Sequence, residues 1–196
     1  MDTQLLSQYH EISEDPSLIE TLRSVSLVIF DVDGVLTDGG LLYSESGECI
    51  KRFNVKDGVA MKLLPKWGVE VAVITAKDSA PLHKRMKDLN VKHFYPGCHD
   101  KAAAFTELKS KLGVESQTVV YIGDDVIDLQ VMPLVGMSIC PNDAHLLVRR
   151  HCDLTLKAAG GTGAARELAD LILAARMPLE DAYELAMQPA FEAKEN

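Results

Sequence analysis

The chain of 196 residues is long enough for one domain with a sizeable core but short for two. With 47% hydrophobic and 25% charged residues it has a globular composition, and no apolar run approaches the roughly 20 residues of a membrane span. The net charge of −9 argues against nucleic acid and anionic membranes as partners, because both need a basic face. The first 20 residues lack the pattern of a secretory signal, so we expect a cytoplasmic protein.

The N-terminal extension, residues 1–22, is predicted to contain one short packing helix. Asp15 followed by Pro16 is typical of an N-cap and the first helical position. Residues 27–30 then form an apolar run, which is typical of a strand buried on both faces of a parallel sheet. The first part of the chain therefore predicts a helix followed by a central strand.

Two carboxylates, Asp31 and Asp33, follow this strand directly, and Gly34 then allows a turn. Ligands of open parallel sheets bind at the carboxyl ends of the strands. Two close carboxylates repel each other in a partly dry site unless a cation lies between them or one is protonated. The alternative interpretation, a polar turn after a strand, needs only one Asp. We therefore expect a chemically active site here.

A turn cluster between two short apolar segments predicts a β-hairpin, and residues 40–57 are expected to form a small flap. A helix should run from Gly58 to the residue before Pro65. Strand and helix then alternate, which predicts an α/β fold with a parallel sheet covered by helices on both faces. The predicted strands are 70–75, 93–95, 118–122, 137–140 and 153–156, and the predicted helices are 80–89, 101–112, 126–134, 143–150 and 165–175.

A second acidic cluster follows the strand predicted at 118–122. It contains Asp124 and Asp125, with Asp128 one turn later. Acidic residues also favour the first turn of a helix, and this alternative is strongest for Asp125 and Asp128. Strand-end clusters in one parallel sheet can converge on a single ion. Because Asp31, Asp33 and Asp124 offer only oxygen ligands, they suit Mg²⁺ better than Zn²⁺.

Two further groups are suited to an anion. Thr75 ends a predicted strand and offers a hydroxyl to a phosphate oxygen, and Lys77 follows it. Lys101 would begin a helix, where the macrodipole disfavours a cation, so its position indicates an anion nearby. The alternative is a solvated lysine.

The remaining features of the chain are expected to be structural. Gly160, Gly161 and Gly163 lack the pattern of a phosphate loop and are predicted to be a flexible hinge before a C-terminal tail. The tail comprises residues 158–196, and its final segment, residues 177–196, should hold a short helix and a disordered end. The four cysteines form no CxxC pair, which favours reduced and mostly buried thiols over disulfides or a zinc site.

These motifs resemble those of the haloacid-dehalogenase-type phosphatases. DVDGVLTDG, the Thr of VITAKDS, the Lys of HDK and GDDVIDLQVM follow the order of the four motifs of that family, over nearly the whole chain. The resemblance implies one Rossmann-like domain over residues 1–196, with the hairpin flap in place of a cap domain.

The resemblance also implies roles for individual residues. Asp31 would be the nucleophile that forms an aspartyl-phosphate, and Asp33 the acid and base. Thr75 and Lys101 would bind the phosphoryl group. Asp31, the Asp33 backbone carbonyl and Asp124 would hold Mg²⁺. Carboxylate nucleophiles and metal-assisted phosphoryl transfer agree with this set of groups.

Within the family, the short length and the segments KRFNVKDG and GGTGAARE are similar to the phosphatases of 3-deoxy-D-manno-octulosonate 8-phosphate. That branch acts in lipopolysaccharide precursor synthesis and assembles as a homotetramer. Two alternatives remain, a phosphatase of a nine-carbon sugar acid phosphate and a non-catalytic scaffold. The resemblance implies substrate contacts from Asp33, Asn54, Val55, Lys56, Asp57, Gly58, Lys62, Lys77, Arg85, Lys101 and Asp125.

This chain departs from the branch at some of these positions. Relatives often carry Arg at positions 62 and 77, where this chain has Lys62 and Lys77. Lysine cannot make the bidentate fork of arginine with a carboxylate. Together with Arg85, these lysines still supply more positive charge than one phosphoryl group requires, which predicts a second anion on the substrate.

The flap is too small to close the site alone, so a neighbouring subunit is expected to help to exclude water. The segment GGTGAARE, with Arg166, is predicted to reach the active site of that neighbour. On this interpretation, removal of residues 160–196 should weaken catalysis without unfolding the core.

Overall fold

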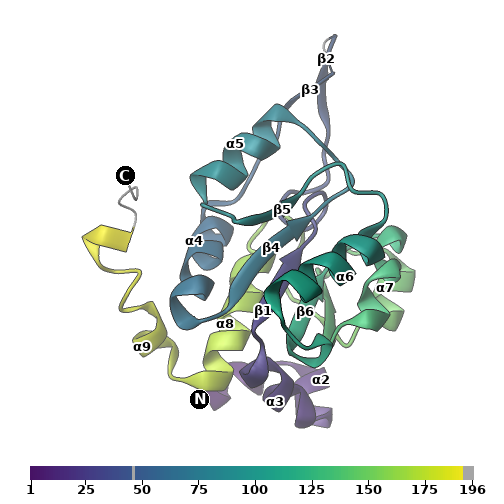
Figure 1. Ribbon diagram of the computed structural model, residues 1–196. Coiled ribbons are helices and arrows are strands. Elements are labelled where there is room, and N and C mark those ends of the chain that lie inside the picture. Colours follow the sequence, from purple (N-terminus) through teal and green to yellow (C-terminus); the bar gives the residue numbers. More distant parts are fainter. Residues whose placement is uncertain (46, 192–196) are drawn as a thin grey trace.

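A parallel sheet forms the centre of the fold (Figure 1). The computed structural model describes residues 1–45 and 47–191. Within them, six strands pair in the order β5-β4-β1-β6-β7-β8, and all neighbours are parallel. This confirms the predicted Rossmann-like sheet. The strands are β1 (Leu27–Phe30), β4 (Glu70–Ile74), β5 (His93–Tyr95), β6 (Val119–Ile122), β7 (Met137–Cys140) and β8 (Leu154–Thr155).

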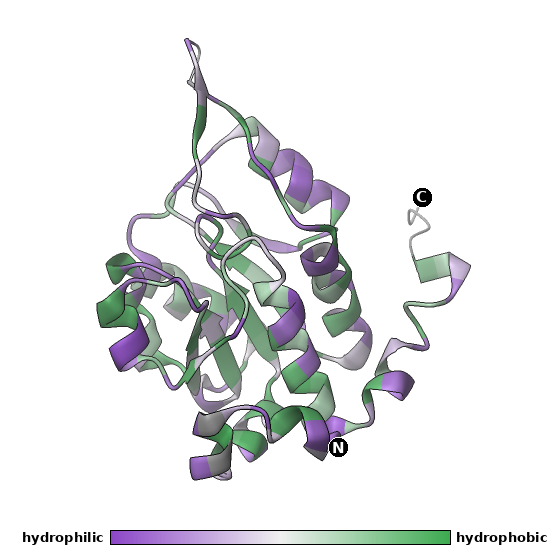
Figure 2. Ribbon diagram, turned by 180° about the vertical axis from the view of Figure 1, so that it is seen from behind, coloured by the Kyte–Doolittle hydropathy of each residue, from purple (hydrophilic) through white to green (hydrophobic). Residues whose placement is uncertain are grey.

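Helices cover both faces of the sheet because successive side chains of a strand point to opposite sides. Val28 and Phe30 of β1 pack against one group of helices, and Leu27 and Ile29 pack against the other. The central strands are correspondingly hydrophobic in Figure 2. The first group is α1 (Thr3–Leu6), α2 (His10–Glu14), α3 (Ser17–Ser24), α4 (Val55–Leu63), α5 (Ala80–Asp88) and α8 (Ala164–Arg176), and the second is α6 (Lys101–Leu112) and α7 (Leu146–His151).

None of the helices in the described part of the chain has the length and apolar character that a membrane crossing requires. The predicted N-terminal helix is α3, which begins one residue later than predicted, with Pro16 rather than Asp15 at the N-cap position. Asp15 Oδ1 still accepts a hydrogen bond from the Ser17 backbone N–H at 2.9 Å. The short helices α1 and α2 precede it and were not predicted individually. The N-terminal extension is thus helical over more of its length than the sequence pattern indicates.

Helix α4 begins before the predicted start at Gly58. Asn54 is its N-cap and its Oδ1 accepts the Lys56 backbone N–H at 2.9 Å. Three residues of the predicted flap, 55–57, therefore belong to α4. Pro65 does not stop the helical conformation either, because the 3₁₀ helix η1 (Leu64–Trp67) tolerates a proline in its first turn.

The helix predicted at 126–134 is instead two 3₁₀ segments, η3 (Val126–Gln130) and η4 (Met132–Leu134). Pro133 explains the difference. It has no backbone N–H, and in a continuous α-helix its ring would clash with the carbonyl of the preceding turn. A short 3₁₀ segment avoids both costs at its first positions.

The predicted hairpin is present as β2 (Leu42–Ser44) and β3 (Gly47–Ile50), which pair antiparallel. It projects from the body of the molecule beyond α5 (Figure 1). Two of its large apolar side chains, Tyr43 and Ile50, are 63% and 56% exposed. The hairpin therefore offers apolar surface away from the core.

The C-terminal segment contains the helix predicted at 165–175, but this helix belongs to the core rather than to a loose tail. Helix α8 packs against α4, α3 and α1, and nine of its 13 residues are buried. Removal of residues 160–196 would therefore delete a core helix, so the expectation of an intact truncated core is wrong. Helix α9 (Leu179–Tyr183) and η5 (Pro189–Phe191) follow α8. The end predicted to be disordered includes residues 192–196, which lie outside the described residues.

A flexible hinge is predicted for the glycines before α8, but the structure differs. Gly160 and Gly161 are held in place, and both contact the loop after β1. Gly161 N donates to Val35 O at 2.9 Å, and Gly160 N donates to Asp143 Oδ1 at 2.9 Å. A Cβ on Gly160 would lie 2.0 Å from Gly34 O. The close backbone contact explains the glycine better than flexibility does.

Of the four cysteines, all free, only Cys140 is buried, so the expectation of mostly buried thiols is wrong. The Sγ atoms of Cys140 and Cys152 lie 3.2 Å apart. The pair joins the end of β7 to the residue after α7, a proximity that the spacing of the cysteines does not indicate.

Candidate active site

Three of the predicted site residues lie where β4, β1 and β6 end. These strands are neighbours in the sheet, and Thr75, Asp31 and Asp124 follow their carboxyl ends. Asp31 N donates to Ile122 O at 3.0 Å, and Thr75 N donates to Tyr95 O at 3.1 Å. The sheet ladder thus extends to both residues and fixes their backbones.

Lys101, the first residue of α6, reaches into this group with a side chain that is only 1% exposed. Its Nζ lies 3.0 Å from Asp31 Oδ1 and 2.7 Å from Asp128 Oδ1, and it donates to Tyr121 Oη at 3.2 Å. Burial lowers the pKa of Lys101, but the two carboxylates outweigh it, so the pKa is raised. The sequence predicts an anion beside Lys101 at the start of this helix, and the structure places two carboxylates there, those of Asp31 and Asp128.

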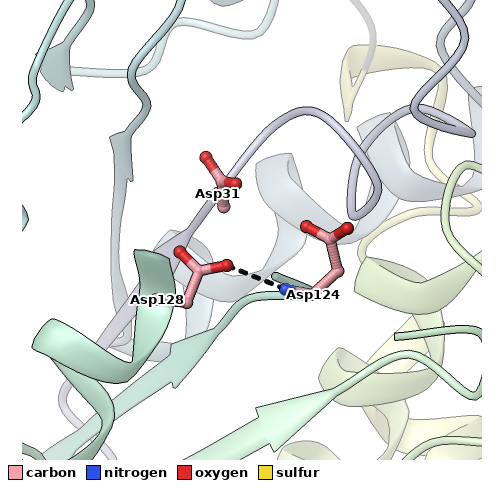
Figure 3. Close-up of side chains that lie close together, drawn as sticks. All are labelled: Asp31, Asp124 and Asp128. Atoms are coloured by element: carbon pink, nitrogen blue, oxygen red, sulfur yellow. Dashed lines mark hydrogen bonds between the residues drawn. The ribbon is translucent and has the colours of Figure 1, made fainter. Parts of the chain in front are cut away.

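Asp128 organises the cluster, although the sequence pattern indicates only a helix-start acid for it. Its Oδ1 accepts from Lys101 and from Tyr121 Oη at 2.6 Å. Its Oδ2 accepts the backbone N–H of Asp124 at 2.9 Å (Figure 3) and that of Asp125 at 3.1 Å. Asp125 and Asp128 form a capping box at the start of η3. Their spacing of three residues is the sequence signal that could have indicated this role of Asp128.

The cluster concentrates negative charge. One carboxylate oxygen from each of Asp31, Asp124 and Asp128 lies within 4.8 Å of the others (Figure 3). Burial, reinforced by the charge of Asp31, raises the pKa of Asp124 to about 8. Burial also raises the pKa of Asp31, against the opposing charge of Lys101. The charged form of the site is therefore costly without a further cation.

A divalent cation fits the groups that remain available. Asp124 Oδ1 is buried and has no hydrogen-bond partner among the described residues. Both oxygens of Asp128 are already occupied, which leaves Asp31 and Asp124 as the side chains suited to hold a hard cation. Gly34, at φ +87°, lets the loop approach, because a Cβ there would lie 2.0 Å from Asp124 Oδ2.

Asp33 lies in the loop after β1, partly exposed, and is not paired with Lys101. Its Oδ1 lies 2.5 Å from Lys51 Nζ and accepts from Thr37 Oγ1 at 3.4 Å. Lys51 in turn contacts Glu48 of the hairpin at 2.6 Å. Neither Lys51 nor Glu48 was identified from the sequence, because nothing in their local pattern distinguishes them from solvated charges.

Thr75 is buried, and its Oγ1 accepts the Lys77 backbone N–H at 3.4 Å. The Lys77 side chain is exposed on the loop that follows β4.

Four of the substrate positions implied by resemblance form a packed block beside this loop. Arg85 Nη2 donates to Asn54 O at 3.2 Å, and a Cβ on Gly58 would lie 2.4 Å from that same nitrogen. Asp57 Oδ1 accepts the Arg166 backbone N–H at 3.0 Å, at the start of α8. Within one subunit these contacts hold α4, α5 and α8 together.

The Arg166 side chain, for which a contact with a neighbouring subunit is predicted, contacts two side chains of its own subunit. Its Nε donates to Asp170 one turn later at 3.2 Å, and its guanidinium lies 4.2 Å from the centre of the Tyr183 ring. An i,i+4 ion pair and a cation–π contact account for this position.

The other implied positions are more dispersed. Val55, Lys56 and Asp125 are exposed. Lys62 lines a cavity of about 580 Å³ together with Glu70, at the amino end of β4, whereas Lys77 follows its carboxyl end. This separation argues against one small ligand that contacts both lysines within a single subunit.

Comparison with known proteins identifies relatives over most of the chain. The haloacid dehalogenase-like hydrolase family matches residues 87–168. The 3-deoxy-D-manno-octulosonate 8-phosphate phosphatase KdsC of Escherichia coli (strain K12) is 39% identical over 178 residues, 91% of this chain and 94% of that protein.

Solved structures that are similar to this chain include phosphatases of the same kind. The cobalt-bound deoxy-D-mannose-octulosonate 8-phosphate phosphatase of Haemophilus influenzae has a TM-score of 0.79 at 38% identity, over 88% of this chain and 98% of that one. The Moraxella catarrhalis 3-deoxy-D-manno-octulosonate 8-phosphate phosphatase, in complex with magnesium, phosphate and KDO, has a TM-score of 0.82 at 34% identity, over 89% and 99% of the two chains. This chain therefore belongs to the haloacid dehalogenase-like hydrolases, in the family of the 3-deoxy-D-manno-octulosonate 8-phosphate phosphatases.

Proposed function

We propose that the protein is a Mg²⁺-dependent phosphatase that hydrolyses 3-deoxy-D-manno-octulosonate 8-phosphate to the free sugar acid and phosphate, a step of lipopolysaccharide precursor synthesis. The observation that carries this is the Asp31–Lys101 contact of 3.0 Å beside the buried, unpartnered Asp124 Oδ1. The family of the relatives and the magnesium, phosphate and KDO bound by the Moraxella catarrhalis phosphatase support it.

In the first step, a carboxylate oxygen of Asp31 attacks phosphorus, and the bond from phosphorus to the sugar oxygen breaks. Asp33 gives its proton to the departing alkoxide. Thr75 and Lys101 bind the phosphoryl oxygens, and the ammonium of Lys101 offsets their charge. The products are an aspartyl-phosphate and the free sugar acid.

In the second step, water attacks phosphorus and the bond between phosphorus and the Asp31 oxygen breaks. Asp33, now unprotonated, takes the proton of the attacking water. Phosphate leaves and Asp31 returns to its carboxylate form, while Asp33 is again protonated. The cycle therefore restores both residues.

The cation would be held by Asp31, Asp124 and the backbone carbonyl of Asp33. Bound Mg²⁺ supplies Lewis-acid stabilisation of the phosphoryl charge and offsets the carboxylates. The two raised aspartate pKa values support this assignment, because a carboxylate cluster of this kind becomes favourable once a cation is bound.

We further propose a homotetramer in which a neighbouring subunit helps to close the site. The exposed apolar side chains of the hairpin favour burial against another copy. Assembly would also allow Lys62 and the exposed Val55 and Lys56 of α4 to contact a substrate in an adjacent subunit. A cytoplasmic location stays a prediction.

The nucleophile assignment is tested by Asp31→Asn, which keeps the shape of the side chain but removes its charge and most of its nucleophilicity. Turnover should fall by several orders of magnitude while the circular dichroism spectrum stays unchanged. Asp38→Asn, at an exposed position of the same loop, is the matched control and should keep its activity. Near-normal turnover of Asp31→Asn would exclude the assignment.

Metal removal is expected to abolish activity, and Mg²⁺ should restore it without any need for zinc. Mg²⁺ should also raise Tm, and by more at about pH 8 than at about pH 6. The folded-state pKa of Asp124, about 8, lies above the unfolded value of about 3.9. The folded metal-free protein therefore binds this proton more tightly than the unfolded chain does, and its free energy of unfolding falls as the pH rises between the two values.

Mg²⁺ must displace that proton, and its binding therefore strengthens with pH. Asp124→Asn is the control variant and should lose most of the Mg²⁺-dependent rise in Tm. Full activity in metal-free protein, or a Tm that does not respond to Mg²⁺ in the wild type, would contradict the site.

Substrate choice follows from the surplus positive charge of Lys62, Lys77 and Arg85. The carboxylate of the sugar acid should contribute about 2 kcal/mol or more. We expect kcat/KM for 3-deoxy-D-manno-octulosonate 8-phosphate to exceed that for glucose 6-phosphate by roughly thirtyfold or more. Similar kcat/KM values for the two substrates would show that these basic residues do not bind the substrate carboxylate. A preference for a nine-carbon sugar acid 9-phosphate would favour the alternative substrate.

Assembly is tested by sedimentation of the wild type, which should be a tetramer, and of a Tyr43→Ser/Ile50→Ser variant. Loss of apolar hairpin surface should give smaller species and a higher KM or lower kcat. The control is Leu134→Ser, which removes an exposed apolar side chain outside the hairpin. A fully active monomer would refute the proposed role of a neighbour.

A further inference from the structure

A chain of three charges joins the hairpin to the loop after β1, and the two side chains on the hairpin side are buried. Lys51 Nζ lies 2.5 Å from Asp33 Oδ1 and 2.6 Å from Glu48 Oε1. The side chains of Lys51 and Glu48 are 1% and 7% exposed. Glu48 belongs to β3 and Lys51 follows that strand directly, whereas Asp33 belongs to the loop that carries Asp31.

The burial of Lys51 needs an explanation beyond packing. Removing an ammonium from water costs several kcal/mol, and the attraction of nearby carboxylates offsets this only when the geometry is good. A solvated lysine would meet no such cost. Lys51 instead lies between two carboxylates and is in direct contact with both.

The two oxygens of Asp33 are placed differently. Oδ1 accepts a hydrogen bond from Lys51 Nζ and a longer one, at 3.4 Å, from Thr37 Oγ1. Oδ2 is buried and has no hydrogen-bond partner among the described residues. The carboxylate is thus held by one oxygen, while the other remains available for a proton.

We propose that Lys51 is a positioning residue: it holds Asp33 by Oδ1 so that Oδ2 is the oxygen that gives a proton to the leaving alkoxide and later takes one from water. This inference rests on the proposed function, because it takes Asp33 as the acid and base. Lys51 itself exchanges no proton and touches no substrate in this scheme. Glu48 fixes the lysine from the hairpin side.

A neighbouring ion pair supplies a matched control. Arg52 Nη2 contacts Asp38 Oδ2 and joins the same two segments, but both side chains are exposed, at 72% and 41%. Exposed pairs of this kind contribute little to stability. A general loosening of the hairpin would affect both ion pairs, whereas only the pair of Lys51 with Asp33 bears on the position of the Asp33 carboxylate.

The test compares two leaving groups in Lys51→Met. The alkoxide of a sugar needs a proton in order to leave, whereas p-nitrophenolate leaves without one, so only the first reaction depends on the acid in the phosphorylation step. With 3-deoxy-D-manno-octulosonate 8-phosphate, the rate of sugar acid release in the first turnover should fall by about 10- to 100-fold. With p-nitrophenyl phosphate, the first-turnover burst should change by less than about threefold, and KM for both should change little.

Arg52→Met should behave like the wild type with both substrates and have the same Tm within error. If Lys51→Met does not fold, Lys51→Gln, which can still hydrogen-bond to Glu48, allows the same comparison. An equal loss with both leaving groups, or no loss with either, would overturn the inference.

Failure of the proposed function would look different. The wild type would then cleave another phosphate ester better than the sugar acid phosphate. The comparison of alkyl and aryl leaving groups in Lys51→Met would still decide the role of Lys51, with the best alkyl phosphate of the wild type as substrate.

Discussion

The site depends most on the carboxylate of Asp128, which is fully buried and accepts four hydrogen bonds. One oxygen holds Lys101 and Tyr121, and the other holds the backbone that follows β6. Removal of one partner of a buried charge pair typically costs about 3–5 kcal/mol, because the other charge is left uncompensated. Asp128 thus fixes both the Lys101 ammonium beside Asp31 and the backbone that carries Asp124. In this way it sets the position of α6 relative to the ends of β1 and β6.

A second constraint is the close approach of backbone segments behind the site. Gly34 leaves room for the Asp124 carboxylate, and Gly160 leaves room for the carbonyl of Gly34. Any Cβ at either position would lie about 2.0 Å from an oxygen atom. The loop after β1 is therefore confined between the acidic cluster and the segment before α8. These glycines are needed for distance rather than for flexibility.

Local sequence patterns were sufficient to predict the framework. The predicted bounds of β1, β5, α6 and β7 match the structure. Strand β1 is an uninterrupted apolar run, and α6 lies between the N-cap Asp100 and the C-cap Gly113. The convergence of Asp31, Thr75 and Asp124 also followed from the pattern, since carboxyl ends of adjacent parallel strands meet at one edge. The order of the strands in the sheet then brings these three residues together.

Contacts between distant segments could not be predicted in this way. Lys51 and Asp33 are 18 residues apart, and Arg85 and Asn54 are 31 apart. Their pairing depends on how the hairpin and α5 pack, which no local period encodes. Asp128 shows the same limit, because an acid in a first helical turn has an adequate local explanation and its burial against Lys101 depends on tertiary structure.

These long-range contacts give the hairpin two connected roles. Its outer apolar side chains favour burial against another copy, and its base holds Asp33 through Glu48 and Lys51. A buried ion pair tolerates little displacement, because a shift of either strand would leave a charge without its partner. In the proposed tetramer, the contacts that fix the hairpin would therefore also fix the oxygen of Asp33 that exchanges protons. Assembly and proton transfer would then both depend on the hairpin and the residue after it, residues 42–51, rather than on a separate cap domain.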